Sequence, residues 1–290
     1  MTTIPRQSEK LTSLETLFES SHGPALPLPA RIARLYGKFR LPKPRSHAHV
    51  FSNFVSTVDG IVSLQEKGHS GGGDISGFSI QDRMVMGLLR AAADVVVVGS
   101  GTLDADAHHV WTPAGICPEL ARDYRRMEIS LGKSAPSLNV VVSARGLVNM
   151  HLPVFTSGQV PAMIVTTATG AKRLGRQKVP SSVRICAVGR RTGEIPARDI
   201  LEALGGVTAG RRILVEGGPR LLAAFYKERL IDEQFLSLAP QISGRLPGDA
   251  RMSLVMGETF APQDPLWGRL IDVRRGARLL FLRYSFPTDH

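Results

Sequence analysis

Short apolar runs that recur along the chain are the feature that most restricts how this sequence can fold. The runs are DVVVVGS at 94–100, LNVVVS at 138–143, AMIVTT at 162–167, VRICAVG at 183–189 and ILVEGG at 213–218. Uninterrupted runs of this length are typical of strands that are buried on both faces of a sheet. Helical patterns lie between several of them, and strands that alternate with helices predict a mainly parallel sheet covered by helices on both faces.

The remaining elements follow from local patterns. AHVFSNFVS at 48–56 reads as a further strand, and SIQDRMVMGLLRAAA at 79–93 as a helix with Ser79 as N-cap and Asp82 three residues later. A second helix is predicted at 197–206, and another begins at Pro219. The segments 232–240 and 277–286 are predicted to be closing strands with antiparallel pairing.

The sequence divides into an extension and a body. Residues 1–46 are predicted to be an N-terminal extension or linker, and residues 47–286 one α/β domain. Within the extension, LTSLETLF at 11–18 has apolar residues at helical spacing, which predicts one short amphipathic helix. Packing of this segment on the body and packing on a second subunit are both open.

Composition narrows the class of protein. The 290 residues are 43% hydrophobic, and their net charge of +11 suits an anionic partner. No apolar run approaches ~18 residues, so no membrane span is expected, and the absence of an apolar leader near the N-terminus predicts a cytoplasmic protein. Cys117 and Cys186 stand far apart, which makes a disulfide framework or a cysteine zinc site a poor interpretation.

A run of basic residues at 31–45 contains no acid. It has two interpretations, a basic arm for nucleic acid and a solvated linker. Pro42 and Pro44 favour the linker, and no nucleic-acid-reading motif accompanies the run. A nucleic-acid partner is therefore not expected.

Two glycine turns follow predicted strands. Gly217 and Gly218 precede Pro219, so a strand, a bare backbone turn and a helix N-terminus follow one another, as in sites for a pyrophosphate. A tight connection with no ligand explains this turn equally well. In VVVVGSGTL, Gly101 and Thr102 offer a second such turn, and the two turns would share one edge of a parallel sheet.

Polar residues elsewhere are weaker candidates. Thr57 and Asp59 follow the first strand of the body, where an Asp-Gly pair is also a common turn. His108 and His109 are adjacent and have no third ligand at a useful spacing, so no metal site is predicted. His109 remains a candidate substrate contact.

Taken together, NFVSTVDG, LLRAAADVVVVGSGTL and LVEGGPRLLAAFYKERLIDEQFLSLAPQISG resemble the signature blocks of one family, over roughly 53–284. This is the pyrimidine reductase of riboflavin biosynthesis, which occurs alone or as the C-terminal half of a bifunctional deaminase–reductase. The resemblance implies a dihydrofolate-reductase-like three-layer fold, a homodimer and NADPH as cofactor. It also implies reduction of 5-amino-6-(5-phosphoribosylamino)uracil, a phosphorylated pyrimidine. The zinc deaminase pattern is absent.

The resemblance assigns roles to individual residues. It places Val55, Thr102 and Asp106 beside the cofactor, and Arg90 and Glu216 beside the substrate, where we also place Thr57 and His109. With the glycine turns and a polar strand end added, the predicted cofactor set is Val55, Gly101, Thr102, Asp106, Ser143, Gly217, Gly218, Pro219, Arg220, Leu221 and Leu222. On a helical wheel Arg90 lies opposite the apolar stripe, so a solvated arginine is the alternative for this residue.

The expected reaction is hydride delivery to C1′ of the substrate, with Asp59 and Glu216 as the acids proposed near the reacting groups. Asp59 has the alternative role of fixing its turn. Three departures from the family pattern concern the substrate half: Asn53 replaces a frequent lysine, a glycine-rich loop occupies 70–77, and Trp111 stands near an expected arginine. A dihydropterin reductase, a basic nucleic-acid-binding protein and a catalytically weakened paralogue are the alternatives.

Overall fold

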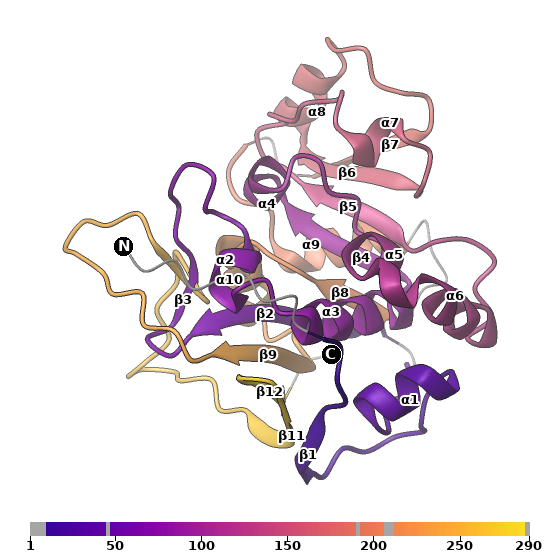
Figure 1. The fold of residues 1–290 in the computed structure, drawn as a ribbon. Helices are drawn as coiled ribbons and strands as arrows, with labels where there is room; N and C mark the ends of the chain where they lie inside the picture. Colours follow the sequence, from indigo (N-terminus) through magenta and orange to yellow (C-terminus); the bar gives the residue numbers. More distant parts are fainter. Residues whose placement is uncertain (1–9, 45–46, 190–191, 206–211, 288–290) are drawn as a thin grey trace.

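The computed structural model describes residues 10–44, 47–189, 192–205 and 212–287, which form an α/β fold around one large sheet (Figure 1). Its strands are β1 (Glu15–Glu19), β2 (His49–Thr57), β3 (Ile61–Ser63), β4 (Val95–Gly99), β5 (Leu138–Val142), β6 (Ala162–Thr167), β7 (Val183–Val188), β8 (Arg212–Val215), β9 (Glu233–Ala239), β10 (Met252–Ser253), β11 (Arg269–Gly276) and β12 (Leu279–Ser285). Its helices are α1 (Ala30–Tyr36), α2 (Gly72–Ser76), α3 (Ile80–Ala92), α4 (Ser100–Ala105), α5 (Pro113–Ile116), α6 (Ala121–Ser130), α7 (Pro153–Thr156), α8 (Ala168–Leu174), α9 (Ala197–Gly205) and α10 (Pro219–Lys227), with a 3₁₀ turn at Pro118–Leu120.

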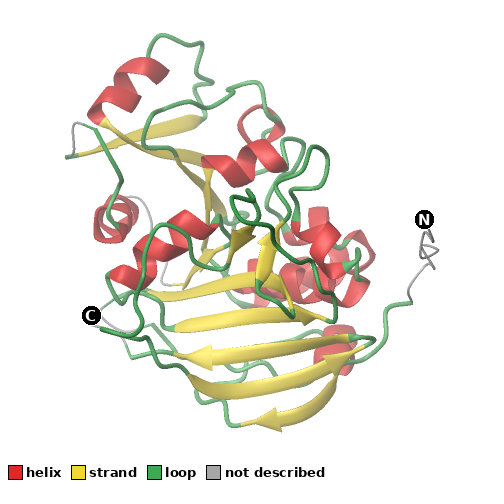
Figure 2. Cartoon of the chain, turned by 90° about the vertical axis from the view of Figure 1, so that its left-hand side faces the viewer, coloured by secondary structure: helices red, strands yellow, loops and turns green. Residues whose placement is uncertain are grey.

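The main sheet is twisted and continuous (Figure 2), with the strand order β1-β11-β12-β9-β2-β8-β4-β5-β6-β7 in the described ranges. Every pairing from β9 through β7 is parallel, whereas β12, β11 and β1 are added antiparallel at one edge. The mainly parallel sheet with an antiparallel C-terminal edge, predicted from the apolar runs and the resemblance, is confirmed. Strands β3 and β10 form a separate two-stranded sheet.

Two cores cover the two faces of the sheet, which gives the predicted three layers. One core joins the sheet to α1, α3 and α6 through side chains such as Ile32, Leu88 and Met127. The other joins it to α9 and α10 through residues such as Leu204 and Phe225. Because both faces are covered, the central parallel strands β4, β5 and β8 are mostly apolar, as their sequence runs are.

The predicted helix at 79–93 forms as α3, and its cap is the predicted one. The side chain of Ser79 accepts a hydrogen bond from the backbone N–H of Asp82 at 3.5 Å. Met84 and Leu88, which belong to the apolar stripe, are fully buried. The cap and the stripe together fix where α3 begins and which side faces the sheet.

The short helix predicted at 11–18 is wrong, because Glu15–Glu19 form the edge strand β1, paired antiparallel with β11. An isolated helix of two turns has little stability of its own, so pairing with the exposed edge of β11 decides the conformation. Leu14 is buried against the body. Of the two packing alternatives, the structure therefore shows packing on the body, while the boundary at residue 46 stays a prediction.

Over the residues that the structure describes, the basic run is not the solvated linker that the sequence favoured. Residues 30–36 form α1, and Tyr36, Phe39 and Leu41 are buried in the core. The cationic heads are held at the surface: Arg31 donates to the carbonyl of Glu119 at 2.8 Å. The apolar residues between the charges anchor this segment to the body. The charges and prolines of the run did not indicate that these apolar residues would be buried.

The pairing predicted for the closing strands is half wrong. β12 is antiparallel to β9 as expected, but β9 runs parallel to β2. The chain passes from β8 through α10 to β9, and a helical crossover of this kind returns the chain in the same direction as the strand it left. The helix beginning at Pro219 was thus the signal for a parallel β9.

Arg274 ties the N-terminal segment to the sheet. It is 1% exposed, and its guanidinium donates to the Asp272 carboxylate at 2.8 Å, to Thr16 Oγ1 at 2.9 Å and to the carbonyl of Tyr36. It also lies over the Tyr36 ring, 4.3 Å from the centroid. One side chain therefore joins β11, β1 and α1.

Arg274→Ala should lower the free energy of unfolding by about 3–5 kcal/mol, because it leaves the buried Asp272 carboxylate without its cation. Arg275→Ala is the matched control, since the neighbouring Arg275–Glu15 pair is exposed and worth about 0–1 kcal/mol. Urea unfolding of both variants measures the difference. Equal losses in the two variants would contradict the role of Arg274.

Candidate functional site

The two glycine turns predicted to share one edge of the sheet do lie together. β4 ends at Gly99, whose N–H donates to the carbonyl of Gly217 at 2.6 Å, and the N–H of Glu216 donates to the carbonyl of Val97 at 3.0 Å. The Gly217–Gly218 peptide bond is cis, and Gly217 has a φ of 114°. Glycine adopts such a φ without the steric cost that other residues meet. The ends of β4 and β8 therefore form one bare backbone surface.

Helix α10 begins at this surface. Gly218 is its N-cap and supplies no side-chain cap, and Pro219 occupies the first turn. A Cβ added at either Gly217 or Gly218 would stand 3.3 Å from Thr102 Oγ1, so the Thr102 hydroxyl lies directly beside the turn. Uncapped N–H groups and the positive end of a helix dipole suit an anion.

The other predicted cofactor residues fall around this turn in different ways. Leu221 and Leu222 are buried in the core, whereas Arg220 is exposed. Gly101, in α4, has open space where a side chain would be. Ser143 follows β5, one strand from β4, because Gly99 pairs with Val142.

Beyond Ser143, the hydroxyls at the end of β6 are bonded to the backbone that follows β5. Thr166 Oγ1 donates to the Ser143 carbonyl at 2.6 Å, and Thr167 Oγ1 donates to the carbonyl of Ala144 at 2.8 Å. Thr167 also caps α8 by accepting from the N–H of Gly170 at 3.1 Å. Because these hydroxyls already bond to the backbone of the turns, we take the end of β5 at Ser143 as the polar boundary of the site.

On the α3 side of the sheet, Arg90 and Glu216 form a buried ion pair. Arg90 Nε lies 2.9 Å from Glu216 Oε2, and Arg90 Nη2 lies 2.8 Å from the same oxygen. The two side chains are 3% and 5% exposed. The solvated arginine considered from the helical wheel is therefore wrong: the end of β8 supplies a carboxylate that holds Arg90 inside.

The remaining donors of Arg90 are also occupied. Its Nη1 lies 2.7 Å from His109 Nε2 and 3.3 Å from the carbonyl of Thr112. Since an arginine can only donate, His109 Nε2 accepts and its proton lies on Nδ1. Burial, together with the charge of Arg90, lowers the pKa of His109 to about 3. The imidazole is therefore neutral at neutral pH.

Trp111 lies behind this histidine. The His109 and Trp111 rings meet edge to face at 5.2 Å between centroids, and Trp111 is 3% exposed. Its backbone N–H donates to Asn139 Oδ1 at 3.0 Å. Trp111 therefore supports the imidazole and packs into the core.

Asp59 and Thr57 form a separate group. Thr57 Oγ1 donates to Asp59 Oδ1 at 2.6 Å, which is the main reason that the pKa of Asp59 falls to about 2. Asp59 Oδ2 also accepts from the N–H of Gly244 at 2.7 Å. This is the turn-fixing role named as the alternative for Asp59.

The structure does not bring Asp59 and Glu216 together. Ser52 of β2 pairs with Val215 of β8, so Glu216 is level with the middle of β2. Thr57 lies five residues beyond Ser52, which is roughly 17 Å along a strand at 3.3 Å per residue. Of the two acids proposed near the reacting groups, only Glu216 lies at the glycine turns.

The glycine-rich stretch at 70–77, expected as a flexible loop, contains the short helix α2. A Cβ added at Gly71 would stand 3.2 Å from Asp106 Oδ1, and one added at Gly72 would stand 3.1 Å from Val55 Cγ1. Glycines are needed here because the backbone approaches both predicted cofactor contacts. Burial raises the pKa of Asp106, while the charge of Arg90 opposes the rise.

Sequence reasoning missed the buried carboxyl of Asp82, which appeared only as a residue in the capping turn. It is 4% exposed, and burial raises its pKa to about 6, with the nearby Glu216 adding to the rise. An acid in the first turn of an otherwise apolar helix was the available signal, but helix-dipole stabilisation explained it equally well.

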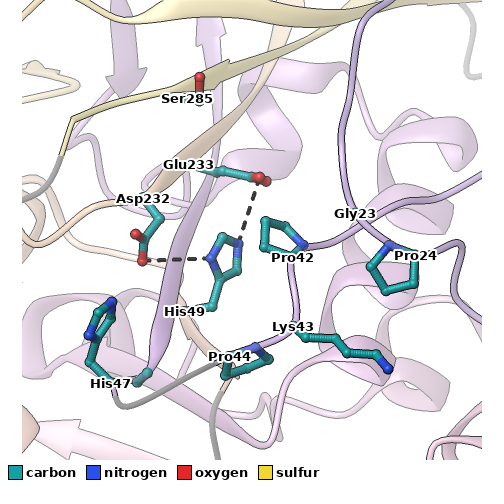
Figure 3. Close-up of a pocket in the computed structure, with 11 residues that line it drawn as sticks. Gly23, Pro24, Pro42, Lys43, Pro44, His47, His49, Asp232, Glu233 and Ser285 are labelled. Atoms are coloured by element: carbon teal, nitrogen blue, oxygen red, sulfur yellow. Dashed lines mark ion pairs between the residues drawn. The ribbon is translucent and has the colours of Figure 1, made fainter.

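A cavity of about 520 Å³ lies at the opposite edge of the sheet, where β2 and β9 begin. Figure 3 shows the imidazole of His49 between Asp232 and Glu233, at 3.7 and 3.8 Å, with Pro42 and Lys43 across the opening. Glu233 is already paired with the buried Arg283 at 2.6 Å. Ligands of parallel α/β sheets bind at the carboxyl ends of strands, so the candidate site is the edge formed by the glycine turns.

Neither a metal centre nor a membrane span is found in the described ranges. No group of three or more histidine, cysteine, aspartate or glutamate side chains there is arranged to hold a metal ion. Among the helices of those ranges, none combines the length and apolar character needed to cross a bilayer.

The sequence of this chain is similar to those of known proteins. A model of the RibD C-terminal domain family matches residues 48–270. A curated relative from Archaeoglobus fulgidus, a 2,5-diamino-6-ribosylamino-4(3H)-pyrimidinone 5′-phosphate reductase, is 27% identical over 214 residues, which cover 73% of this chain and 88% of the relative.

Solved structures show the same fold at lower identity. A pyrimidine reductase-like protein from Corynebacterium diphtheriae aligns with a TM-score of 0.63 and 18% identity, over 83% of this chain and 93% of that one. A deaminase/5-amino-6-(5-phosphoribosylamino)uracil reductase from Thermotoga maritima aligns with a TM-score of 0.59 and 16% identity. The alignment covers 83% of this chain but 57% of the length of the Thermotoga protein.

The low pKa of His109 predicts a pH dependence of stability. An unfolded histidine titrates near 6.5, so the stability contributed by the neutral folded imidazole is complete above that pH and is lost as pH falls toward 3. Wild-type protein should lose up to about 1.4 kcal/mol per pH unit from this group below pH ~6. Denaturant unfolding of His109→Gln should lack this component.

His108→Gln is the matched control for that measurement, because His108 is the exposed neighbour on the same loop. It should keep the wild-type dependence on pH. A His109→Gln protein with the same dependence as wild type would show that His109 is not held neutral by Arg90.

Proposed function

The chain belongs to the RibD C-terminal domain family, and we propose that it is an NADPH-dependent reductase of riboflavin biosynthesis. Its proposed substrate is 5-amino-6-(5-phosphoribosylamino)uracil, whose ribosyl group is reduced to ribityl. One observation carries the proposal. The family match covers the three elements that meet at the candidate site: the β4 turn, the β8 turn with α10, and the buried Arg90–Glu216 pair.

The bare turn suits a dinucleotide. Gly217 and Gly218 leave no side chain between the backbone and a pyrophosphate, and the N-terminus of α10 supplies N–H groups and a favourable dipole. Thr102 would add a hydroxyl donor, while Val55 and Ser143 would flank the rest of the cofactor. NADPH would supply the hydride when bound there, and the protein would orient it and exclude water.

Glu216 is the proposed substrate contact. Arg90 fixes the orientation of its carboxylate with two donors, which makes it a preformed acceptor. An aminopyrimidine presents several N–H groups that such an acceptor can bind. Because the donors of Arg90 are already used inside the protein, we assign Arg90 the positioning of Glu216 instead of direct contact with phosphate.

A dihydropterin is the second candidate substrate, because it offers N–H donors to the same acceptor. Trp111 and the glycine-rich residues 70–77 occupy positions where the sequence departs from the family pattern. A nucleic-acid partner is not part of the proposal, since the described basic residues of 30–40 belong to the folded body. The homodimer remains a proposal from the family, to be checked by light scattering.

The defining experiment follows NADPH oxidation by the full chain with each of the two substrates. Turnover with the aminopyrimidine and none with dihydropterin is expected. The reverse pattern would assign the same fold to the other substrate. Tight NADPH binding without turnover on either substrate would contradict the proposed reaction while leaving the cofactor site in place.

Gly218→Ala should weaken NADPH binding about tenfold, or 1.4 kcal/mol, because its methyl group would fill the space between the turn and Thr102. Gly175→Ala is the control, since its added Cβ would make only an ordinary contact of 3.5 Å at the end of α8. Fluorescence titration measures the affinities, and thermal unfolding checks that both variants fold. Unchanged affinity in Gly218→Ala would argue against a cofactor at this turn.

A further inference from the structure

The cavity at the edge of the sheet where β2 and β9 begin is not used by the proposed function. Its volume of about 520 Å³ lies within the range of pockets that bind small molecules. Residues at the strand ends line one side, and residues 23–24 and 42–44 of the N-terminal segment line the other. The packing of that segment on the body therefore creates a second concave site, at the other edge of the sheet from the glycine turns.

His49 lines this cavity and is nearly buried, with 7% of its side chain exposed. Its Nε2 atom is buried and has no hydrogen-bond partner among the described residues. The great majority of buried polar atoms do have a partner, so an exception requires an explanation. An imidazole with an unsatisfied nitrogen in the wall of a cavity indicates a group that is placed for a ligand.

Two carboxylates flank the imidazole. Asp232 Oδ2 lies 3.7 Å from His49 Nδ1, and Glu233 Oε1 lies 3.8 Å from His49 Nε2 (Figure 3). A neutral imidazole has one donor nitrogen and one acceptor nitrogen. Whichever nitrogen carries the proton, the other faces a carboxylate oxygen, which is also an acceptor. A contact between two acceptors requires a donor from elsewhere.

That donor belongs on the Asp232 side. Glu233 is 5% exposed and its carboxylate already accepts from Arg283 at 2.8 Å, whereas the Asp232 side chain is 20% exposed. We therefore place the ring proton of His49 on the buried Nε2, facing Glu233, which leaves Nδ1 as the acceptor. One nitrogen at about 2.8 Å from each atom would bridge Nδ1 and Asp232 Oδ2 across their separation of 3.7 Å.

A donor with a positive charge suits this position best. A bond between a charged donor and a carboxylate is stronger than a neutral bond, and the acceptor here is an acid. Lys43 lines the same cavity, but Figure 3 shows its side chain extending away from His49 and both acids. A metal ion does not fit, because no group of three suitable side chains in the described ranges is arranged to hold one. The remaining class is an organic cation.

Three prolines of the N-terminal segment face this charged end of the cavity. Pro24, Pro42 and Pro44 all belong to its lining. Their rings offer apolar surface and no donor, so they suit the carbon skeleton of a ligand and not its charge. Small-molecule pockets commonly combine such apolar walls with a few polar groups that fix orientation.

We propose that this cavity binds a small organic cation, with a primary ammonium group carried on an apolar stem or ring. The ammonium group donates to Nδ1 of His49 and to the carboxylate of Asp232, and the apolar part packs on the prolines. The site is separate from the glycine turns, so this inference does not depend on the proposed function.

Benzylamine is the probe, because it joins one ammonium group to one ring. Calorimetric titration of the full chain near neutral pH should show saturable binding, about tenfold tighter than that of benzyl alcohol, which has the same ring and no charge. Benzoate, which has the opposite charge, should not bind. Equal affinities for benzylamine and benzyl alcohol, or tighter binding of benzoate, would overturn the proposal.

Two substitutions locate the bound amine. Asp232→Asn removes the charge but keeps an acceptor for the N–H of Val50, so it should weaken benzylamine binding about tenfold. Lys43→Glu adds an acid at the exposed rim and should tighten binding about threefold, even if Asp232→Asn does not fold. Lys67→Glu, on the exposed loop after β3, changes the net charge equally and should have no effect. A folded Asp232→Asn protein with wild-type affinity, or equal effects of the two lysine changes, would contradict the proposal.

NMR of the histidine rings provides a readout at the site itself. Benzylamine should shift the Nδ1 signal of His49, which is identified by its loss in His49→Gln. The ligand-free ring should carry one proton, on Nε2. A His49 ring that already carries protons on both nitrogens would supply both carboxylates with donors by itself, and the proposal would then fail.

Discussion

The buried ion pair between Arg90 and Glu216 is the interaction on which the site depends. It joins the last turn of α3 to the residue that follows β8, and both partners are nearly inaccessible to water. Either charge alone in that position would be strongly destabilising, so each residue requires the other. Because the pair has two donors, it fixes the direction of the Glu216 carboxylate. A fixed acceptor at a strand end is what recognition of a ligand rich in N–H groups requires.

The parallel sheet explains why that carboxylate stands beside a backbone anion site. Parallel strands end at the same edge, so the turns after β4 and β8 are brought together without any direct sequence relation between them. The bond between Gly99 and Gly217 then closes the space between the turns. On one side of the sheet this edge offers the bare N-terminus of α10, and on the other it offers Glu216 held from α3. A ligand that crosses the edge would meet an anion site and a hydrogen-bond acceptor in turn.

Local sequence patterns were enough to predict the elements whose buried residues follow a regular pattern. The runs around Val97, Val140 and Ile164 could only be interior strands, and Ser79 marked the start of α3. The errors occur where a distant partner decides. The edge of β11 turns Glu15–Glu19 into a strand, and the α10 crossover makes β9 parallel. The helical wheel placed Arg90 in solvent because a wheel records only the positions on one helix, and the counter-charge comes from a residue 126 positions later in the chain.

The same limit explains Asp82. In sequence it is one acid in a capping turn, and nothing nearby shows that the assembled fold will bury its side chain. Its raised pKa follows from the assembled fold, because burial favours the neutral acid, whereas Glu216 is buried against the guanidinium of Arg90. Two buried carboxyls, Asp82 and Glu216, therefore have different surroundings, because a single guanidinium pairs with one of them. Arg90, without reaching a ligand itself, would therefore decide how the Glu216 carboxylate is presented.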